Sequence, residues 1–217
     1  MKRKLDNTVL SKEENKNIIN GHFECPEEIT SIGDWAFYRN NNLISITLHQ
    51  GVILIGEYAF AESNLARINL PQGITSIKSY AFWFCNLVNI NLPQGLKSIE
   101  AFAFYACSNL TSITLPQGLE KISQDAFDEC EKLQCIFIDS NSDDEINRIR
   151  ELLPKHLQEK VSPCIHWWLN AKEVLTKNFP EDVCNTIFDQ AKFTFFKKKN
   201  DISPNYSMSL LDYLRYS

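Results

Sequence analysis

Apolar residues recur with a period of 22 or 23 residues over roughly the first two-thirds of the chain. The clearest sign is an Ala-Phe pair, whose phenylalanine falls at Phe37, Phe60, Phe82, Phe104 and Phe127. Four columns of isoleucine or leucine keep the same step, and one of them runs through Ile32, Ile55, Ile77, Ile99 and Ile122. Because five columns stay in phase, the pattern indicates about five copies of one structural unit.

Each copy contains two short segments that the pattern predicts to be extended. The first segment begins at Leu87, and its last positions alternate apolar and polar residues through Ile90 and Leu92. This alternation is typical of a half-buried strand, and Pro93 ends the segment. A Gln-Gly turn, a second extended segment and the Ala-Phe turn complete the unit. Such a unit buries its apolar side only against neighbouring copies, so the sequence predicts an α/β-type solenoid.

Three copies share a fuller motif that runs from the isoleucine through Ala-Phe to a cysteine, at Ile77 to Cys85, Ile99 to Cys107 and Ile122 to Cys130. Asn40 and Ser63 replace the cysteine in the first two copies. With the following Leu-x-x-Ile-x-Leu-Pro, this motif resembles the BspA-like class of leucine-rich repeats over roughly residues 22–139. The resemblance implies a leucine-rich-repeat solenoid that binds protein.

The chain divides into three parts on sequence grounds. Residues 1–21 are expected to form an N-terminal cap with a helix over 11–20, since Ser11 to Glu14 has the form of a capping box and Gly21 suits a helix end. Residues 22–139 are expected to form the solenoid. All seven glycines lie at or before Gly118. Helix-start signals then predict an α-helical domain over 140–217, with helices near 143–153, 155–161, 163–178, 181–197 and 205–215.

Charge and composition exclude several classes of partner. The net charge is -5 and there is no basic stripe, so nucleic acid is not an expected partner. No apolar stretch approaches the roughly 20 residues that span a bilayer, and the N-terminus lacks an ordinary export signal. We expect a soluble protein without integral membrane contact. Seven cysteines without a CxxC pair favour a reducing compartment.

Motifs that carry chemistry are scarce, so no catalytic residue, cofactor or metal is expected. The four histidines lack zinc-ligand spacing, and no phosphate-binding or hydrolase motif is present. An enzyme remains the alternative hypothesis, with Cys164, Cys184 and His166 of the predicted helical domain as its candidate residues. Cys164 and His166 lie two residues apart, which is poor geometry for a dyad on a helix.

Two sets of positions are candidates for binding a partner. Outward positions of the main strand are small or hydrogen-bonding and include Arg67, Asn69, Asn89 and Asn91. Aromatic residues flank the Ala-Phe pair at Trp35, Tyr38, Tyr58, Tyr80, Trp83, Phe102 and Tyr105. Such residues supply most binding energy at interfaces. The alternative is that these rings pack on one another and tile the surface of the solenoid.

Proteins similar to this one include surface adhesins and effectors that intracellular bacterial pathogens inject into host cells. The resemblance implies a virulence-associated effector that binds a host protein, is held in the bacterial cytoplasm before delivery, and leaves by a non-classical route. An adhesin is the further alternative, and it predicts an export signal that this N-terminus does not show. The sequence leaves the oligomeric state open.

Overall fold

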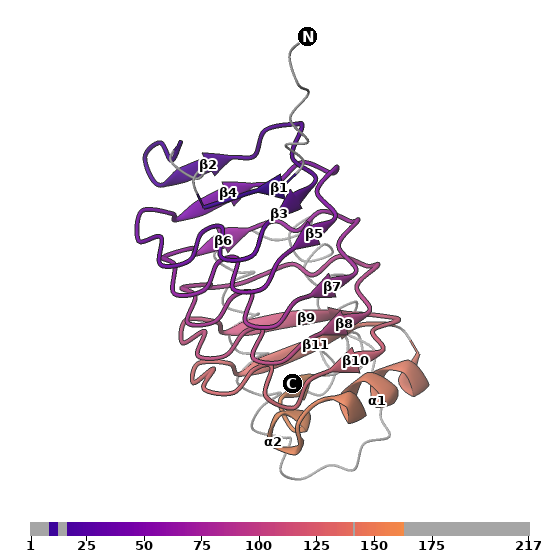
Figure 1. The fold of residues 1–217 in the computed structure, drawn as a ribbon. Coiled ribbons are helices and arrows are strands. Elements are labelled where there is room, and N and C mark those ends of the chain that lie inside the picture. The colour runs from indigo at the N-terminus through magenta and orange to yellow at the C-terminus, as the bar shows by residue number, and fades with distance from the viewer. Residues whose placement is uncertain (1–8, 13–16, 141, 163–217) are drawn as a thin grey trace, which may run out of the picture. The chain divides into compact units, whose positions relative to one another are not determined.

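The computed structural model describes residues 9–12, 17–140 and 142–162 (Figure 1). The chain separates into two units, Met1–Pro163 and Cys164–Ser217, and the described residues all belong to the first. The helices predicted at 163–178, 181–197 and 205–215 lie outside the described residues.

One face of the solenoid is a ladder of parallel strands, which we call the main ladder. Its strands form two three-stranded sheets, with the orders β2-β4-β6 and β9-β11-β12. Asn91 joins them, because it forms parallel bridges to Asn69 on one side and Thr114 on the other. The strands are β2 (His22–Glu24), β4 (Ser45–Thr47), β6 (Arg67–Ile68), β9 (Ser112–Pro116), β11 (Cys135–Asp139) and β12 (Val161–Ser162).

A second parallel ladder is built from two-residue strands (Figure 1). Its sheets have the orders β1-β3-β5 and β7-β8-β10, and residues of one sequence column pair with each other, as Ile77 does with Ile99. The predicted in-phase stacking is therefore confirmed. The strands are β1 (Val9–Leu10), β3 (Ser31–Ile32), β5 (Leu54–Ile55), β7 (Ser76–Ile77), β8 (Ser98–Ile99) and β10 (Lys121–Ile122).

The core consists of the repeated columns stacked into ladders of like side chains. The phenylalanines of the Ala-Phe pairs are at most 1% exposed, and successive rings lie 5.2–5.4 Å apart with nearly parallel planes from Phe37 to Phe127. Phe23 closes the N-terminal end of this stack with an edge contact to Phe37 at 5.1 Å. Each ring therefore packs mainly against the equivalent ring of the next turn.

The N-terminal segment differs from the predicted helix. Residues 11–12 and 17–20 are not helical, and residues 13–16 lie outside the described residues. Asn20 and Gly21 have φ of 51° and 80°, and Ile19 and His22 exchange two backbone hydrogen bonds of 2.9 Å. This is the geometry of a two-residue hairpin with an Asn-Gly turn. The prediction of a helix reaching residue 20 was wrong because Gly21 supplies positive φ to a hairpin and not to a helix end.

The number of turns is about six, where the sequence pattern indicated about five. The second ladder has six strands because β1 forms an additional one, in which Leu10 is buried and pairs with Ile32. No Ala-Phe pair accompanies this strand in the sequence. Counting Ala-Phe pairs therefore missed it.

Residues 142–162 pack against the last turn of the solenoid. Helix α1 (Asp143–Leu152) begins at Ser142, whose hydroxyl accepts a hydrogen bond from the backbone N–H of Glu145. The shorter α2 (Lys155–Gln158) follows, and the predicted helix to residue 161 is replaced at its end by β12. Val161 pairs with Ile136 because the edge of β11 would otherwise be open.

Candidate protein-binding surface

The turn around each Ala-Phe pair places two side chains outside the core. The residue two places after the phenylalanine has positive φ in all five turns, and the residue just before the alanine in four of them, as at Phe84 (51°) and Tyr80 (59°). Positive φ is uncommon outside glycine, so the turn must be held by other contacts. Backbone N–H groups of Tyr80, Phe82 and Phe84 each donate to a carbonyl of the next turn at 2.9–3.0 Å. Hydrogen bonds between turns thus hold the strained residues in place.

The residues before the alanine form a column of stacked rings. Trp35 and Tyr58 have centroids 3.9 Å apart, Tyr58 and Tyr80 4.4 Å, and Tyr80 and Phe102 5.0 Å. The interplanar angles are 5°, 5° and 19°. Stacking of this kind is favourable beyond the burial of area. The four predicted residues therefore form one ordered array.

A second group of rings packs edge-on against this column. Trp83 contacts Tyr80 at 6.3 Å and Phe84 at 4.7 Å, and Tyr105 contacts Phe102 at 5.6 Å. Tyr38 meets Trp35 in the same manner at 4.9 Å. We call the whole array the aromatic belt, and its members are Trp35, Tyr38, Tyr58, Tyr80, Trp83, Phe84, Phe102 and Tyr105.

Two members of the belt protrude from it. Phe84 is 51% exposed and Trp35 is 43% exposed, whereas the other six are of intermediate burial. Mutual packing therefore covers most of the ring surface, as the tiling alternative predicted, and leaves large apolar areas at two points. Phe84 was not among the candidates that the sequence analysis named. Its equivalents in the other turns are Arg39, Glu62, Ala106 and Glu129. A phenylalanine in an otherwise charged or small column was the available signal.

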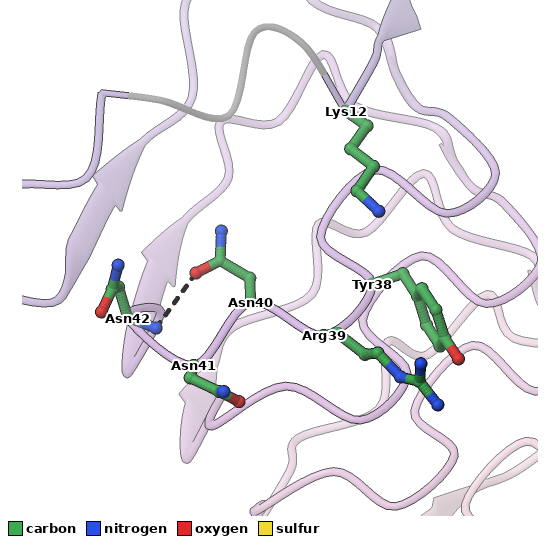
Figure 2. A pocket seen from close by; sticks show the side chains of 6 residues that line it. All are labelled: Lys12, Tyr38, Arg39, Asn40, Asn41 and Asn42. Atoms are coloured by element: carbon green, nitrogen blue, oxygen red, sulfur yellow. Dashed lines mark hydrogen bonds between the residues drawn. The ribbon is translucent and has the colours of Figure 1, made fainter.

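A shallow polar hollow of about 480 Å³ adjoins the N-terminal end of the belt (Figure 2). The Lys12 Nζ atom lies 5.5 Å and the Arg39 guanidinium 4.9 Å from the Tyr38 ring centroid. Both Arg39 and the Tyr38 hydroxyl bond to Glu62 at 2.8 Å, and these hydrogen bonds lower the pKa of Glu62. The hollow is lined by Lys12, Tyr38, Arg39, Asn40, Asn41 and Asn42.

The candidates on the main strands lie where the alternation placed them. All four side chains are exposed, namely Arg67, Asn69, Asn89 and Asn91. Arg67, Asn69 and Asn91 belong to the main ladder and Asn89 lies two residues before Asn91, whereas the belt lies on the turns that lead from the second ladder into the main ladder. This strand surface offers hydrogen-bonding groups and one guanidinium but no aromatic ring at these positions.

The repeat cysteines are buried thiols. The Sγ atoms of Cys107 and Cys130 lie 3.1 and 3.0 Å from backbone carbonyls of the preceding turn, and burial raises the pKa of both thiols. For Cys85, burial raises the pKa to about 12. Thiols in such surroundings are poor nucleophiles.

The other side chains of residues 9–12, 17–140 and 142–162 indicate no metal site and no membrane span. This part of the chain has no cluster of three or more histidine, cysteine, aspartate or glutamate side chains able to hold a metal ion. Its helices are also too short or too polar to cross a bilayer. The alternative catalytic candidates Cys164, Cys184 and His166 lie outside the described residues.

Comparison with known proteins agrees with this architecture. Residues 30–148 match the family described as "BspA type Leucine rich repeat region" in six copies. The chain belongs to this family. The six matched copies correct the count of five; because residues 30–148 exclude β1, they do not correspond one to one with the six strands of the second ladder. No curated protein matches the chain significantly.

Solved structures of other proteins, two of them described as leucine-rich, resemble this BspA-type chain. The T. pallidum protein TpLRR is 30% identical, with 54% of this chain and 58% of that chain covered and a TM-score of 0.53. A leucine-rich cell surface protein of Faecalibacterium prausnitzii is 27% identical over 58% and 34%, with a TM-score of 0.54. The pneumococcal vaccine antigen PcpA, at 20% identity over 73% and 43% and a TM-score of 0.59, shares the fold. This chain therefore matches only 58% or less of each of these proteins.

Proposed function

We propose that the repeats form a protein-interaction module and that the aromatic belt is its binding surface. The observation that carries this proposal is the exposure of Trp35 and Phe84 at 43% and 51% within an array of rings ordered by their own stacking. Rings that are already fixed lose little conformational entropy on binding. A leucine-rich-repeat solenoid is typically a binding scaffold, which supports a non-catalytic role for the repeats.

The belt is favoured over the main-strand surface because of the residue types involved. Binding energy concentrates in a few tryptophan, tyrosine and arginine side chains near the centre of an interface. On the main strands Arg67 is the one such candidate, and its exposed neighbours are asparagines. We therefore assign Arg67, Asn69, Asn89 and Asn91 a secondary role, as hydrogen-bonding contacts of a partner that reaches beyond the belt.

Partner capture tests the assignment of the surface. The full chain and a Trp83→Ala, Phe84→Ala variant, shown by circular dichroism to be folded, are used to capture partners from eukaryotic cell lysate. Affinity for a captured partner should fall by more than about 30-fold in the variant, since hot-spot residues contribute about 2 kcal/mol or more. The matched control is Asn89→Ala, Asn91→Ala, for which we expect a change of less than about tenfold. A larger loss in the control than in the aromatic variant would contradict the proposal.

The finer proposal is that the partner is a host protein and that the chain is a bacterial effector delivered by a non-classical route. It rests on the resemblance to effectors with BspA-like repeats. A translocation reporter fused to the full chain should signal inside host cells during infection. Signal that remains confined to the bacteria would refute delivery.

Display on the cell surface is the second candidate function. The Faecalibacterium prausnitzii relative is described as a cell surface protein, and this supports an adhesin. Antibody labelling of intact producing cells separates the two candidates. Strong labelling without permeabilisation is expected of an adhesin, whereas an effector retained before delivery should be labelled only after permeabilisation.

A further inference from the structure

The columns of the aromatic belt change from rings to carboxylates in the turn around Phe127. Asp125 continues the column of Phe102, and its carboxylate lies 3.4 Å from the backbone nitrogen of Phe102. Asp128 continues the column of Tyr105, and Glu129 continues that of Phe84 with the buried Ala106 between them. Glu129 also shares the positive φ of its column, at 59°. The belt therefore meets a border of three carboxylates in register with its rings.

The opposite end of the belt has carboxylates of its own. Asp34 and Glu57 directly precede Trp35 and Tyr58, and both are exposed. The two residues are adjacent, because the backbone N–H of Glu57 donates to the Asp34 carboxylate at 2.8 Å. Within the described part of the chain, neither of them forms a salt bridge.

The cations near the belt are largely committed to other acids. Arg39 pairs with Glu62 at 2.8 Å, and Lys78 pairs with Glu100 at 2.9 Å. Lys12 lies over Tyr38 at the N-terminal end, and His156 is 4.0 Å from Asp128. The carboxylates that border the rings are Asp34, Glu57, Asp125, Asp128 and Glu129. Within the described residues, none of the five forms a salt bridge with a lysine or arginine, so we expect a negative field over the rings.

We infer that the aromatic belt recognises a basic segment of a partner protein, in which arginine or lysine stands next to an apolar anchor. This inference rests on the proposed function and specifies the partner of the same surface. The apolar anchor would pack on Trp83 and Phe84, and a guanidinium would reach the carboxylates of Asp128 and Glu129. Guanidinium groups suit this setting because they pair with carboxylates and also stack on aromatic rings.

Other occupants fit less well. A second copy of the chain would bring its own carboxylates to the belt, and each copy has a net charge of -5. Like charges brought together at an interface oppose association. Nucleic acid would meet the same repulsion from its phosphates. A basic protein segment is the occupant that gains from both the rings and the acids.

Selection from a phage library of short random peptides on the full chain tests the inference. Enriched peptides should be basic and should place arginine or lysine beside a tryptophan, phenylalanine or leucine. The affinity of the synthesised peptide should fall as salt is added. It should be lost in the Trp83→Ala, Phe84→Ala variant and weakened about three- to tenfold in Asp128→Asn, Glu129→Gln.

A control with the same change in net charge separates local recognition from general attraction. The control variant is Glu28→Gln, Glu151→Gln, whose side chains are exposed and lie outside the belt. It should bind the peptide within about twofold of the wild type, because distant exposed charges are screened. All variants are first checked for folding by circular dichroism.

The outcomes distinguish this inference from the proposed function. Neutral or acidic peptides that still need Trp83 and Phe84 would overturn the inference and leave the proposed function standing. Equal losses in the border variant and the control variant would also overturn the inference, since attraction would then be non-specific. Failure to enrich any peptide that depends on Trp83 and Phe84 would count against both.

Discussion

Replacing Phe82 by leucine tests how much of the stability comes from ring stacking between turns. Phe82 is fully buried and lies between Phe60 at 5.4 Å and Phe104 at 5.3 Å, with both interplanar angles at 5°. Leucine keeps a large apolar side chain at the site, so the principal loss is two ring contacts. At about 0.5–1.5 kcal/mol each, we expect the free energy of unfolding to fall by about 1–3 kcal/mol.

The matched control is Phe127→Leu in the same column. Within the described residues, Phe127 stacks on a single ring, that of Phe104 at 5.2 Å. Its replacement should therefore cost about half as much as that of Phe82. Urea unfolding of the full chain, monitored by circular dichroism, measures both losses in free energy of unfolding. The m-value shows whether each variant exposes the same amount of surface on unfolding as the wild type.

A double-mutant cycle separates stacking from burial. The pair Phe60→Leu and Phe82→Leu removes one shared contact, so its two losses should be non-additive by about 0.5–1.5 kcal/mol. The pair Phe37→Leu and Phe104→Leu shares neither a contact nor a common ring partner and should be additive within about 0.5 kcal/mol. Equal coupling in the two pairs, or a loss at Phe127 as large as at Phe82, would refute the reasoning.

Three further predictions concern other parts of the solenoid. The Cys85 thiol should react with a thiol reagent only after denaturant is added, because a pKa of about 12 leaves on the order of one thiolate in ten thousand at pH 8. Gly21→Ala should lower the urea midpoint more than Gly118→Ala. Both have φ near +80°, but a methyl group at position 21 would meet an isoleucine atom at 2.8 Å. Hydrogen bonds from Arg148 and the Gly118 N–H lower the pKa of Glu145 to about 2, so stability present above the unfolded-state pKa is lost as pH falls toward 2. Unfolding curves of Glu145→Gln should lack this loss.

The repeated core could be predicted because every column position has the same role in every turn. Ile32, Ile55, Ile77 and Ile99 are 0% exposed, and Ile122 is 5% exposed. The period alone identifies such positions, since a side chain stacked on its own copy needs no other partner to specify its place. The positions of the predicted belt residues follow from the same reasoning, because they flank the Ala-Phe pair.

The ends of the solenoid could not be predicted in this way because repetition stops there. Asn20-Gly21 is a strong hairpin signal, but its strand partners are too short to show a clear alternation. Val161 belongs to a strand only because the edge of β11 is available to it. The exposure of Phe84 was likewise hidden, since one aromatic in a column of mixed residues reveals little without the packing around it.

The turn-to-turn register also bears on how such a chain can change over generations. Successive phenylalanines of the ladder are spaced by either 22 or 23 residues, and their rings stack in both cases. The extra residue of the longer spacing is therefore accommodated in a surface loop without changing which rings pair. Duplication or loss of one whole internal turn would therefore leave both ladders in phase and both terminal segments intact. Only the number of rings available to a partner would change. A lineage could in this way lengthen or shorten its contact surface in single genetic steps without passing through an unfolded intermediate.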